Sequence, residues 1–333
     1  MDGACANAVT ISVALCTCDG GAFLSDQLAS IAAQTRLPDE LVVRDDASHD
    51  DTPAIVEAFA ARAPFPVRFE RNAERLGSTR NFDGAIAACA GDLIALSDQD
   101  DVWRAEKLSV IERRFREDPG VGLVFSDADL VDAALSPVGA RLWARVGFDS
   151  RRRHLWRTRG ALTALVPGRI VTGATMAFRA TFRALVLPTP DGIGPMIHDG
   201  WISLAIAAVA GVSFIEEPLV AYRQHGAQQI GARETFDARP RLGVIASAAH
   251  VNAYSMHLAS LGALRERLTA GRAGPEGVAA ARRVATILGH FDTRAHLPAR
   301  RLDRLPIVLR ELASRRYHDY GNGVRSLIKD LIV

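Results

Sequence analysis

The chain has 333 residues, of which 48% are hydrophobic and 23% charged, and it carries a formal net charge of +2. This length allows one large domain, or one domain with an appendage, and the composition excludes a low-complexity or intrinsically disordered chain. So small a net charge gives no indication of a nucleic-acid partner.

Strand and helix signals alternate over the first 126 residues. Runs of β-branched and apolar residues predict strands at residues 9–16, 40–45, 67–70, 92–97 and 121–126. Apolar side chains at helical spacing predict helices at residues 23–34, 51–63, 79–89 and 105–117. Strands joined by helices of this length form right-handed βαβ crossovers, so we expect an α/β fold with a mostly parallel sheet covered on both faces.

The remaining chain is predicted to be mixed and then wholly helical. Residues 127–230 contain a hairpin signal at Ser136-Pro137, a β-rich run at 170–178, a helix at 199–210 and a strand at 212–222. From about residue 240 only helical spacing is found, with breaks at residues 271–275 and 296–298. We therefore expect an α/β domain over residues 1–230 and a helical appendage over residues 231–333.

Charge is unevenly divided between these two regions. Residues 231–333 carry 17 Arg and Lys against 9 Asp and Glu, whereas residues 1–230 carry 23 against 29. A basic segment behind an acidic one predicts peripheral contact with an anionic surface, most simply the inner face of the cell membrane. The alternative is a solvated helical face whose arginines pair with nearby acids.

The cysteines and the N-terminal residues bear on location. Cys16 and Cys18 would point to opposite faces of a predicted strand, which disfavours a shared metal ion. Residues 1–8 have neither the basic region nor the apolar core of a secretory signal, so we expect free thiols and a cytoplasmic protein. The most apolar stretch, residues 201–215, is too short to span a bilayer.

Polar residues gather where the predicted parallel strands end. They occupy residues 17–21, 45–48 and 97–101 after three strands, and residues 72–81 ahead of the fourth. Ligands bind at this edge of an open parallel sheet. No glycine-rich dinucleotide fingerprint or P-loop is found, so a different kind of site is expected there.

The most informative of these clusters is Ser-Asp-Gln-Asp-Asp-Val-Trp at residues 97–103. Three carboxylates within four residues repel one another, and a hard divalent cation such as Mg²⁺ or Mn²⁺ would relieve that repulsion. Such an ion can hold a diphosphate and neutralise the charge that develops as a bond to it breaks. The alternative is an acidic turn that caps the helix beginning near Arg104.

Seven motifs, in a fixed order, carry a family resemblance. They read Ala-Leu-Cys-Thr (14–17), Arg-Asp-Asp-Ala-Ser-His-Asp-Asp-Thr (44–52), Leu-Gly-Ser-Thr-Arg-Asn-Phe (76–82), Ser-Asp-Gln-Asp-Asp-Val-Trp (97–103), Thr-Gly-Ala-Thr-Met (172–176), His-Asp-Gly-Trp (198–201) and Tyr-Arg-Gln-His-Gly (222–226). Over residues 9–231 the chain resembles family 2 glycosyltransferases, and in particular bacterial dTDP-rhamnosyltransferases. The resemblance implies the GT-A fold, a Rossmann-like sheet that binds nucleotide-diphospho-sugars.

The resemblance also implies roles on the donor side. Thr17 would line the nucleobase and ribose pocket, and Asp46 would accept the imide N–H of uracil or thymine. Arg80 would approach the diphosphate, with a surface cation as the alternative. Asp19 lies in the same loop, where relatives commonly have Tyr-Asn in place of Cys18-Asp19. Its negative charge is expected to weaken donor binding.

For the metal, the resemblance implies an Asp-x-Asp pair. Asp98 would lie near the ribose and the waters of a bound Mn²⁺ or Mg²⁺, and Asp100 would ligate the ion directly. His225 would be a further metal or diphosphate contact, or else a structural histidine. Asp101 would instead cap the following helix.

On the acceptor side, Asp199 is the implied catalytic base. Transfer with inversion needs a carboxylate that takes the proton of the acceptor hydroxyl as its oxygen attacks the anomeric carbon. The alternative role for Asp199 is the N-cap of a helix. Gly173, Thr175, His198 and Trp201 would border the acceptor pocket.

Together these roles predict a metal-dependent, inverting glycosyltransferase. It would move rhamnose from dTDP-rhamnose to a cell-surface polysaccharide or a lipid-linked oligosaccharide. A UDP-hexose or UDP-N-acetylhexosamine donor stays open, as does a catalytically inactive nucleotide- or sugar-binding module on the same fold. The presence of Asp98, Asp100 and Asp199 together favours the enzyme, because a binding module has no use for a base.

Overall fold

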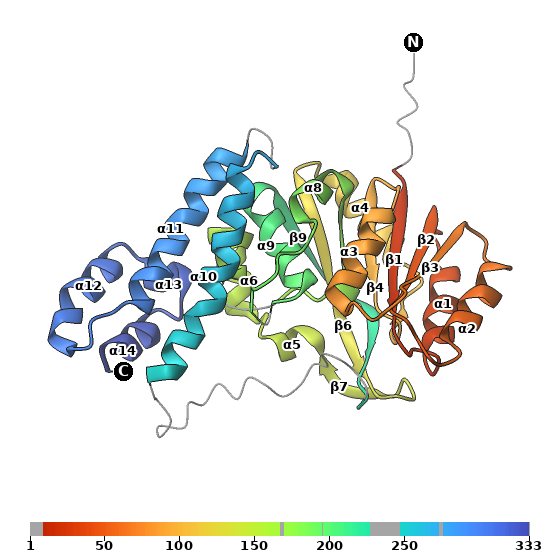
Figure 1. Ribbon diagram of the computed structural model, residues 1–333, viewed down its shortest axis with the longest axis horizontal. Helices are drawn as coiled ribbons and strands as arrows, with labels where there is room; N and C mark the ends of the chain where they lie inside the picture. Colours follow the sequence, from red (N-terminus) through yellow and green to blue (C-terminus); the bar gives the residue numbers. More distant parts are fainter. Residues whose placement is uncertain (1–8, 167–169, 195, 227–246, 273–275, 333) are drawn as a thin grey trace, which may run out of the picture.

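A nine-stranded sheet forms the centre of the molecule in the computed structural model, which describes residues 9–166, 170–194, 196–226, 247–272 and 276–332 (Figure 1). The strand order is β3-β2-β1-β4-β8-β6-β9-β5, and β7 pairs with β6. The strands are β1 (Ile11–Thr17), β2 (Glu40–Asp45), β3 (Val67–Arg71), β4 (Leu93–Ser97), β5 (Val102–Trp103), β6 (Val121–Val131), β7 (Pro137–Arg141), β8 (Met176–Arg179) and β9 (Gly211–Arg223).

Strand direction brings distant loops to one edge of this sheet. β1 is parallel to β2 and β4, β2 is parallel to β3, and β6 is parallel to β9. β8 is antiparallel to both β4 and β6, so its amino end lies at the edge where β4 and β6 end. The expected mostly parallel α/β sheet is confirmed.

Helices cover both faces of the sheet, as predicted. α1 (Leu24–Ala32), α2 (Thr52–Ala60) and α4 (Lys107–Glu117) pack on one face, and α3 (Ser78–Ala88) and α9 (His198–Val209) pack on the other. The pattern of α4 shows why, because Leu108, Ile111 and Phe115 recur at spacings of three and four and are all buried. The predicted helices and strands of the first 126 residues are confirmed with ends shifted by a few residues, and β6 continues to Val131.

The middle of the chain departs further from the sequence prediction. Residues 170–178 were expected to be one strand, but they contain a 3₁₀ turn, η1 (Gly173–Thr175), before β8. Thr175 closes this turn, since both its backbone N–H and its hydroxyl donate to the carbonyl of Thr172. Short elements without a clear sequence signal are α5 (Leu142–Val146), α6 (Ser150–Arg159), α7 (Ala161–Leu165), η2 (Ala180–Phe182) and α8 (Arg183–Val186).

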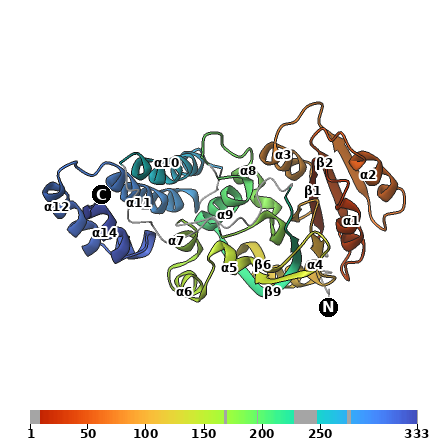
Figure 2. The ribbon, with the colours of Figure 1, turned by 90° about the horizontal axis from the view of Figure 1, so that it is seen from below.

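The C-terminal region is helical, as expected. Its helices are α10 (Ser247–Thr269), α11 (Gly277–Ala295), α12 (Arg301–Ala313), α13 (Arg316–Tyr320) and α14 (Val324–Ile332). α10 and α11 pack against each other, α11 contacts α9, and α12 to α14 lie at the end of the molecule opposite α1 and α2 (Figures 1 and 2). The expected domain boundary at residue 230 falls outside the described residues. Within them, no helix has the length and apolarity that crossing a membrane requires.

Candidate active site

The loops after β1, β2 and β4 meet η1, the first turn of α9 and the end of β9 at one edge of the sheet. The predicted polar clusters are thus brought together by the parallel strands, and β8 adds the Gly173 turn because it runs the opposite way. Ligand sites of open α/β sheets lie at this edge.

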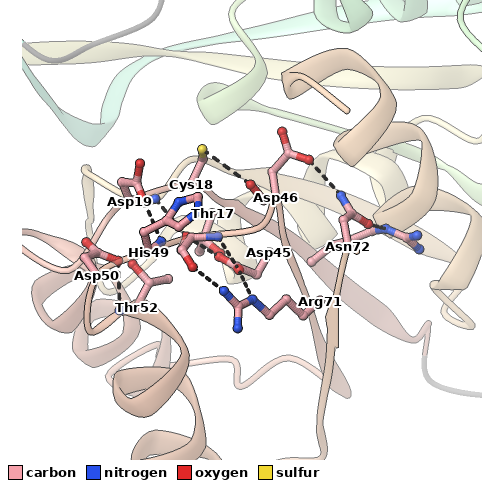
Figure 3. Close-up of polar contacts among 12 residues, drawn as sticks. Thr17, Cys18, Asp19, Asp45, Asp46, His49, Asp50, Thr52, Arg71 and Asn72 are labelled. Atoms are coloured by element: carbon pink, nitrogen blue, oxygen red, sulfur yellow. Dashed lines mark hydrogen bonds and ion pairs between the residues drawn. The ribbon is translucent and has the colours of Figure 1, made fainter. Parts of the chain in front are cut away.

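Two buried aspartates organise the donor side of the site (Figure 3). Asp45 accepts hydrogen bonds from the Thr17 hydroxyl at 2.8 Å and from the backbone N–H of Ser48 at 2.9 Å. The Thr17 side chain is 1% exposed, so its hydroxyl is used within the protein and does not line the pocket as expected. Only its backbone stays near the surface of the site, where its carbonyl accepts from the N–H of Asp46.

Asp46 holds the loop that precedes α3. Its Oδ1 accepts from Asn72 Nδ2 at 2.8 Å and from the N–H of Leu76 at 2.7 Å, and its Oδ2 accepts from the N–H of Gly77 at 2.8 Å. Gly77 has a backbone φ of +82°, an angle that residues other than glycine rarely adopt. No sequence pattern indicates that this carboxylate is a loop anchor.

Asp19 stands beside a cation that sequence reasoning missed. Its Oδ1 accepts the N–H of His49 at 2.8 Å, and its Oδ2 forms an ion pair with Arg75. These two hydrogen bonds lower the pKa of the Asp19 carboxyl. The expected excess of negative charge beside the diphosphate is therefore offset by Arg75.

Residues 97–103 are here called the acidic run. Gln99, which stands between Asp98 and Asp100, joins this run to the loop after β1. Its Oε1 accepts from the N–H of Cys18 at 2.7 Å, and its Nε2 donates to the Cys18 carbonyl at 3.0 Å. A side chain on Gly20 would meet this amide, since its Cβ would lie 2.3 Å from Gln99 Oε1. Gln99 thus holds the loop after β4 against the loop after β1.

The three carboxylates of the acidic run differ in environment. Removal from water, with the charges of Asp100 and Asp199, raises the pKa of Asp98 to about 7. Asp101 is 0% exposed, its Oδ1 accepts the N–H of Arg223 at 3.0 Å, and burial raises its pKa well above the usual value. Helix α4 begins only at Lys107, so the alternative in which Asp101 caps this helix is wrong.

Lys107 lies beneath the acidic run as a buried cation. Its side chain is fully buried, its Nζ donates to the Ala174 carbonyl at 2.6 Å and sits 3.5 Å from the centre of the Trp103 ring. Burial lowers its pKa, while the charges of Asp101 and Asp98 act in the opposite direction. Lys107 therefore links the acidic run to the η1 turn on the acceptor side.

Arg223 is the second buried cation at this edge, and it comes from the end of β9. Its Nε donates to the Asp100 carbonyl at 2.7 Å, and its guanidinium reaches Asp26 at 2.9 Å and lies over the Phe23 ring. His225, two residues further on in the same motif, packs on the Phe23 ring, with ring centroids 4.5 Å apart.

The proposed metal ligands are only partly assembled. His225 Nε2 lies 2.8 Å from Asp100 Oδ2, so these two side chains lie together. Across the residues that the structure describes, however, no group of three or more His, Cys, Asp and Glu side chains is arranged to hold a metal ion. Asp98 therefore does not complete a closed ligand set with Asp100 and His225.

Asp199 faces the same edge from the first turn of α9. Its Oδ2 accepts the N–H of Gly173 at 3.2 Å, and its Oδ1 accepts the N–H of Gly200 at 2.6 Å. The N-cap position of α9 is Ile197, so the alternative role of Asp199 as N-cap is wrong. Its charge contributes to the raised pKa of Asp98. Lys107, which lies beneath the acidic run, donates to Ala174, the residue after Gly173, so the η1 turn joins Asp199 to the acidic run.

All four expected acceptor residues are buried. Gly173 lies in the η1 turn, where a side chain would come within 3.2 Å of His198 Nε2. His198 stacks on Phe82 at 4.1 Å and is 4% exposed, and burial lowers its pKa, so it is a neutral packing residue. Trp201 and Thr175 are 0% and 1% exposed. These two belong to the core, a correction to the predicted acceptor contacts.

The guanidinium of Arg80, the expected diphosphate contact, is already paired with neighbouring residues. It donates to Asp83 at 2.9 Å and to the Thr189 carbonyl at 2.7 Å, and it forms an ion pair with Asp191. In this arrangement Arg80 ties α3 to the segment after α8. A contact with a diphosphate would require it to release Asp191.

Comparison with known proteins identifies the family. The family model for glycosyl transferase family 2 matches residues 12–183, which is just over half of the chain. The chain belongs to glycosyl transferase family 2. It is thus a glycosyltransferase, and the family expected from its motifs is confirmed.

Relatives of this family 2 glycosyltransferase are distant. An uncharacterised glycosyltransferase of Nostoc is 24% identical over 74% of this chain and 76% of its own length. The dTDP-rhamnosyl transferase RfbG of Shigella flexneri is 24% identical over 69% of this chain and 78% of its own length. The crystal structure of S. aureus TarS residues 1–349 with UDP covers 86% of this chain and 71% of that one, at 15% identity and a TM-score of 0.54. The likeness to TarS supports the GT-A fold that the sequence predicts.

Proposed function

We propose that this glycosyltransferase transfers a sugar with inversion from a pyrimidine nucleoside diphosphate, most simply dTDP-rhamnose, to a saccharide acceptor of the cell surface. The observation that carries the proposal is that the η1 turn joins the two groups of carboxylates: Asp199 of α9 accepts the N–H of Gly173, and Lys107, beneath the acidic run after β4, donates to Ala174. The name of the relative RfbG, a dTDP-rhamnosyl transferase, supports the choice of donor.

Asp199 is the proposed catalytic base. Each of its oxygens accepts one backbone N–H, from Gly173 and Gly200, so the carboxylate is oriented and still has lone pairs for a proton. The acceptor hydroxyl gives its proton to Asp199 as its oxygen bonds to the anomeric carbon. The bond from that carbon to the diphosphate oxygen breaks on the opposite face, which inverts the configuration.

Asp98 and Asp100, with His225, are the proposed ligands of a Mn²⁺ or Mg²⁺ ion. The carboxylate oxygens are the donors such ions prefer, and burial, with the negative charges of Asp100 and Asp199, raises the pKa of Asp98. Since the side chains form no closed set, the diphosphate oxygens would supply the remaining ligands. When bound, the ion would stabilise the negative charge on the departing nucleoside diphosphate.

Asp46, in the loop after β2, and Arg75, in the loop before α3, are the proposed donor contacts on the other side of the site. Asp46 Oδ2 accepts the N–H of Gly77, and a carboxylate oxygen has room for a second donor, which the imide N–H of thymine or uracil would fill. Arg75 forms an ion pair with Asp19, which lies in the loop after β1. Its guanidinium is suited to a phosphate oxygen.

A thermal-shift panel with dTDP, UDP and GDP, each with and without Mn²⁺, tests the donor class. We expect dTDP and UDP to raise the melting temperature in the presence of Mn²⁺, because a ligand at 100 times its Kd adds about 2.7 kcal/mol to the free energy of unfolding. Asp100→Asn should lose the Mn²⁺-dependent part of the shift. A response to GDP alone would rule out the pyrimidine donor.

A transfer assay then separates an enzyme from a binding module. Release of dTDP from dTDP-rhamnose is measured with and without a saccharide acceptor, beside UDP-glucose and UDP-N-acetylglucosamine as competing donors. The proposal predicts the fastest release from dTDP-rhamnose. Binding without release from any donor would leave a module that lacks catalysis.

A further inference from the structure

Helix α14 is oriented with a charged residue inside and apolar residues outside. Asp330 is 0% exposed, whereas Val324, Ile328 and Ile332 are 54%, 48% and 53% exposed. These three side chains recur every four residues and so form one stripe along the helix. An amphipathic helix of a water-soluble bundle does the reverse and buries its apolar face.

Helix α12 repeats this arrangement. Its buried side includes Arg304 and Glu311, at 8% and 2% exposure, while Leu302, Leu305 and Leu309 are 85%, 45% and 52% exposed. The three leucines are spaced by three and four residues and share one face. Two helices that lie against each other thus present leucine, isoleucine and valine to solvent.

A buried ionic network holds these orientations in place. Asp330 bonds Arg294 of α11 at 2.7 Å and Tyr317 of α13 at 2.8 Å. Glu311 of α12 bonds His290 of α11 at 2.6 Å. A charge is costly to bury, so rotating either helix to hide its apolar stripe would expose or break these bonds. The outward apolar face is therefore fixed by the fold.

The segment that carries the two apolar stripes is also rich in exposed cations. The exposed charged residues of the segment 300–332 are six basic ones and a single acidic one, Asp303. The six are Arg300, Arg301, Arg310, Arg315, Arg325 and Lys329. On α14, Arg325 and Lys329 each follow an exposed apolar residue, Val324 and Ile328. Apolar residues beside basic ones are typical of helices that lie in the interface of an anionic membrane.

We propose that the exposed stripes of α12 and α14 with their six cations, here called the C-terminal surface, dock on an anionic lipid bilayer. Charge complementarity favours a bilayer over a second copy of the chain, because two such surfaces would bring like charges together. The helices would lie along the interface, in keeping with the lack of a spanning helix among the described residues. The proposal does not depend on which donor or acceptor the enzyme uses.

Co-sedimentation of the full chain with lipid vesicles tests this proposal. We expect binding to vesicles of phosphatidylglycerol and phosphatidylcholine and much weaker binding to phosphatidylcholine alone. Each basic residue near an anionic membrane contributes about a fivefold gain in partitioning, so Arg325→Glu with Lys329→Glu should weaken binding about 25-fold or more. Leu302→Asp with Ile328→Asp should abolish binding.

A matched control comes from the same region. Val278 of α11 is 64% exposed and lies 16 residues before Arg294, about 24 Å along the helix. Val278→Asp should bind vesicles like the wild type. Thermal unfolding and donor-binding shifts of every variant in solution should match the wild type, which separates loss of docking from loss of fold or of donor binding.

Three results would overturn the proposal. The first is wild-type protein that stays in solution with anionic vesicles. The second is stripe variants that sediment as well as the wild type. The third is a dimer, found by analytical ultracentrifugation without lipid, that Leu302→Asp with Ile328→Asp dissociates, since the occupant would then be a second copy.

Discussion

The two regions of this glycosyltransferase place charge in opposite ways. In the sheet region Asp98, Asp100 and Asp199 gather at the strand edge, where burial and their mutual repulsion raise the pKa of Asp98. In α12 and α14 Asp330 and Glu311 lie inside with full sets of partners, and a stripe of apolar side chains on each helix lies outside. Carboxylates that lack compensation mark a place for a ligand, whereas compensated ones hold the fold together.

The largest effect is expected at the strand edge. Asp199→Asn removes the base and keeps the size of the side chain and one of its two backbone hydrogen bonds, because the amide nitrogen cannot accept an N–H. We expect kcat to fall by about 10² to 10⁴. The melting temperature should stay near that of the wild type. Steady-state kinetics of donor consumption measure this, with Asp118→Asn, an exposed acid of the loop before β6, as the matched control. Equal turnover by Asp199→Asn and wild type would contradict the assignment of the base.

The reverse outcome is expected for a carboxylate of the helical region. Asp330→Asn leaves Arg294 buried without its counter-charge, which should lower the free energy of unfolding by about 3–5 kcal/mol. Turnover per folded molecule should not change. Urea denaturation followed by circular dichroism measures the loss, and Asp303→Asn, an exposed acid of α12, is the control. A loss no larger than that of the control would mean that the buried network contributes little.

Lys107 is a buried cation like Arg294, but it lies beside the carboxylates of the acidic run. Lys107→Met keeps most of the side-chain volume and removes the bond to Ala174, so we expect a loss of about 2–3 kcal/mol in unfolding free energy. The chain contains one other lysine, the exposed Lys329, and Lys329→Met should change stability by less than about 0.5 kcal/mol. Equal stability of the two variants would show that Lys107 does not balance the acidic run.

The smallest effect is a pH dependence in the helical region. Burial lowers the pKa of His257 to about 4, so the neutral form is favoured in the folded state. Its contribution is complete above pH 6.5 and is lost as the pH falls toward 4, by about 1–2 kcal/mol between pH 7 and pH 5. His257→Phe should remove that part of the decline in urea midpoints. His296→Phe, at an exposed site, should keep it, and an unchanged slope for His257→Phe would refute the idea.

The sheet was predictable because its strands and helices repeat a simple pattern. β2 was located to the residue, and the acidic run was correctly placed after β4. The elements α5, α7 and α8 have five residues or fewer and so cannot show a period, and α6, with ten residues, buries only Trp156. The turn at Gly173 was missed because its β-rich residues also suit a strand, whereas a tertiary contact with Asp199 and a local bond from Thr175 to Thr172 decide its shape.

The position of the site could be predicted from the sequence more reliably than the roles of its individual residues. Trp201 and Thr175 adjoin motif residues, but the sequence does not show that their side chains turn toward the core. Arg75, Gln99 and Lys107 were missed because their partners lie far away in the chain, for example 81 residues from Gln99 to Cys18. Spacing shows which residues share an element, whereas these contacts join different elements.

The bonds of Asp46 have a consequence for how donor preference would evolve. This carboxylate accepts hydrogen bonds from Asn72, Leu76 and Gly77, so its position depends on the loop that precedes α3. If Asp46 binds the base as proposed, a substitution at Asn72 would shift Asp46 and so change the affinity for that base. Selection for a new sugar nucleotide could therefore act through loop residues while every residue in contact with the donor stays the same.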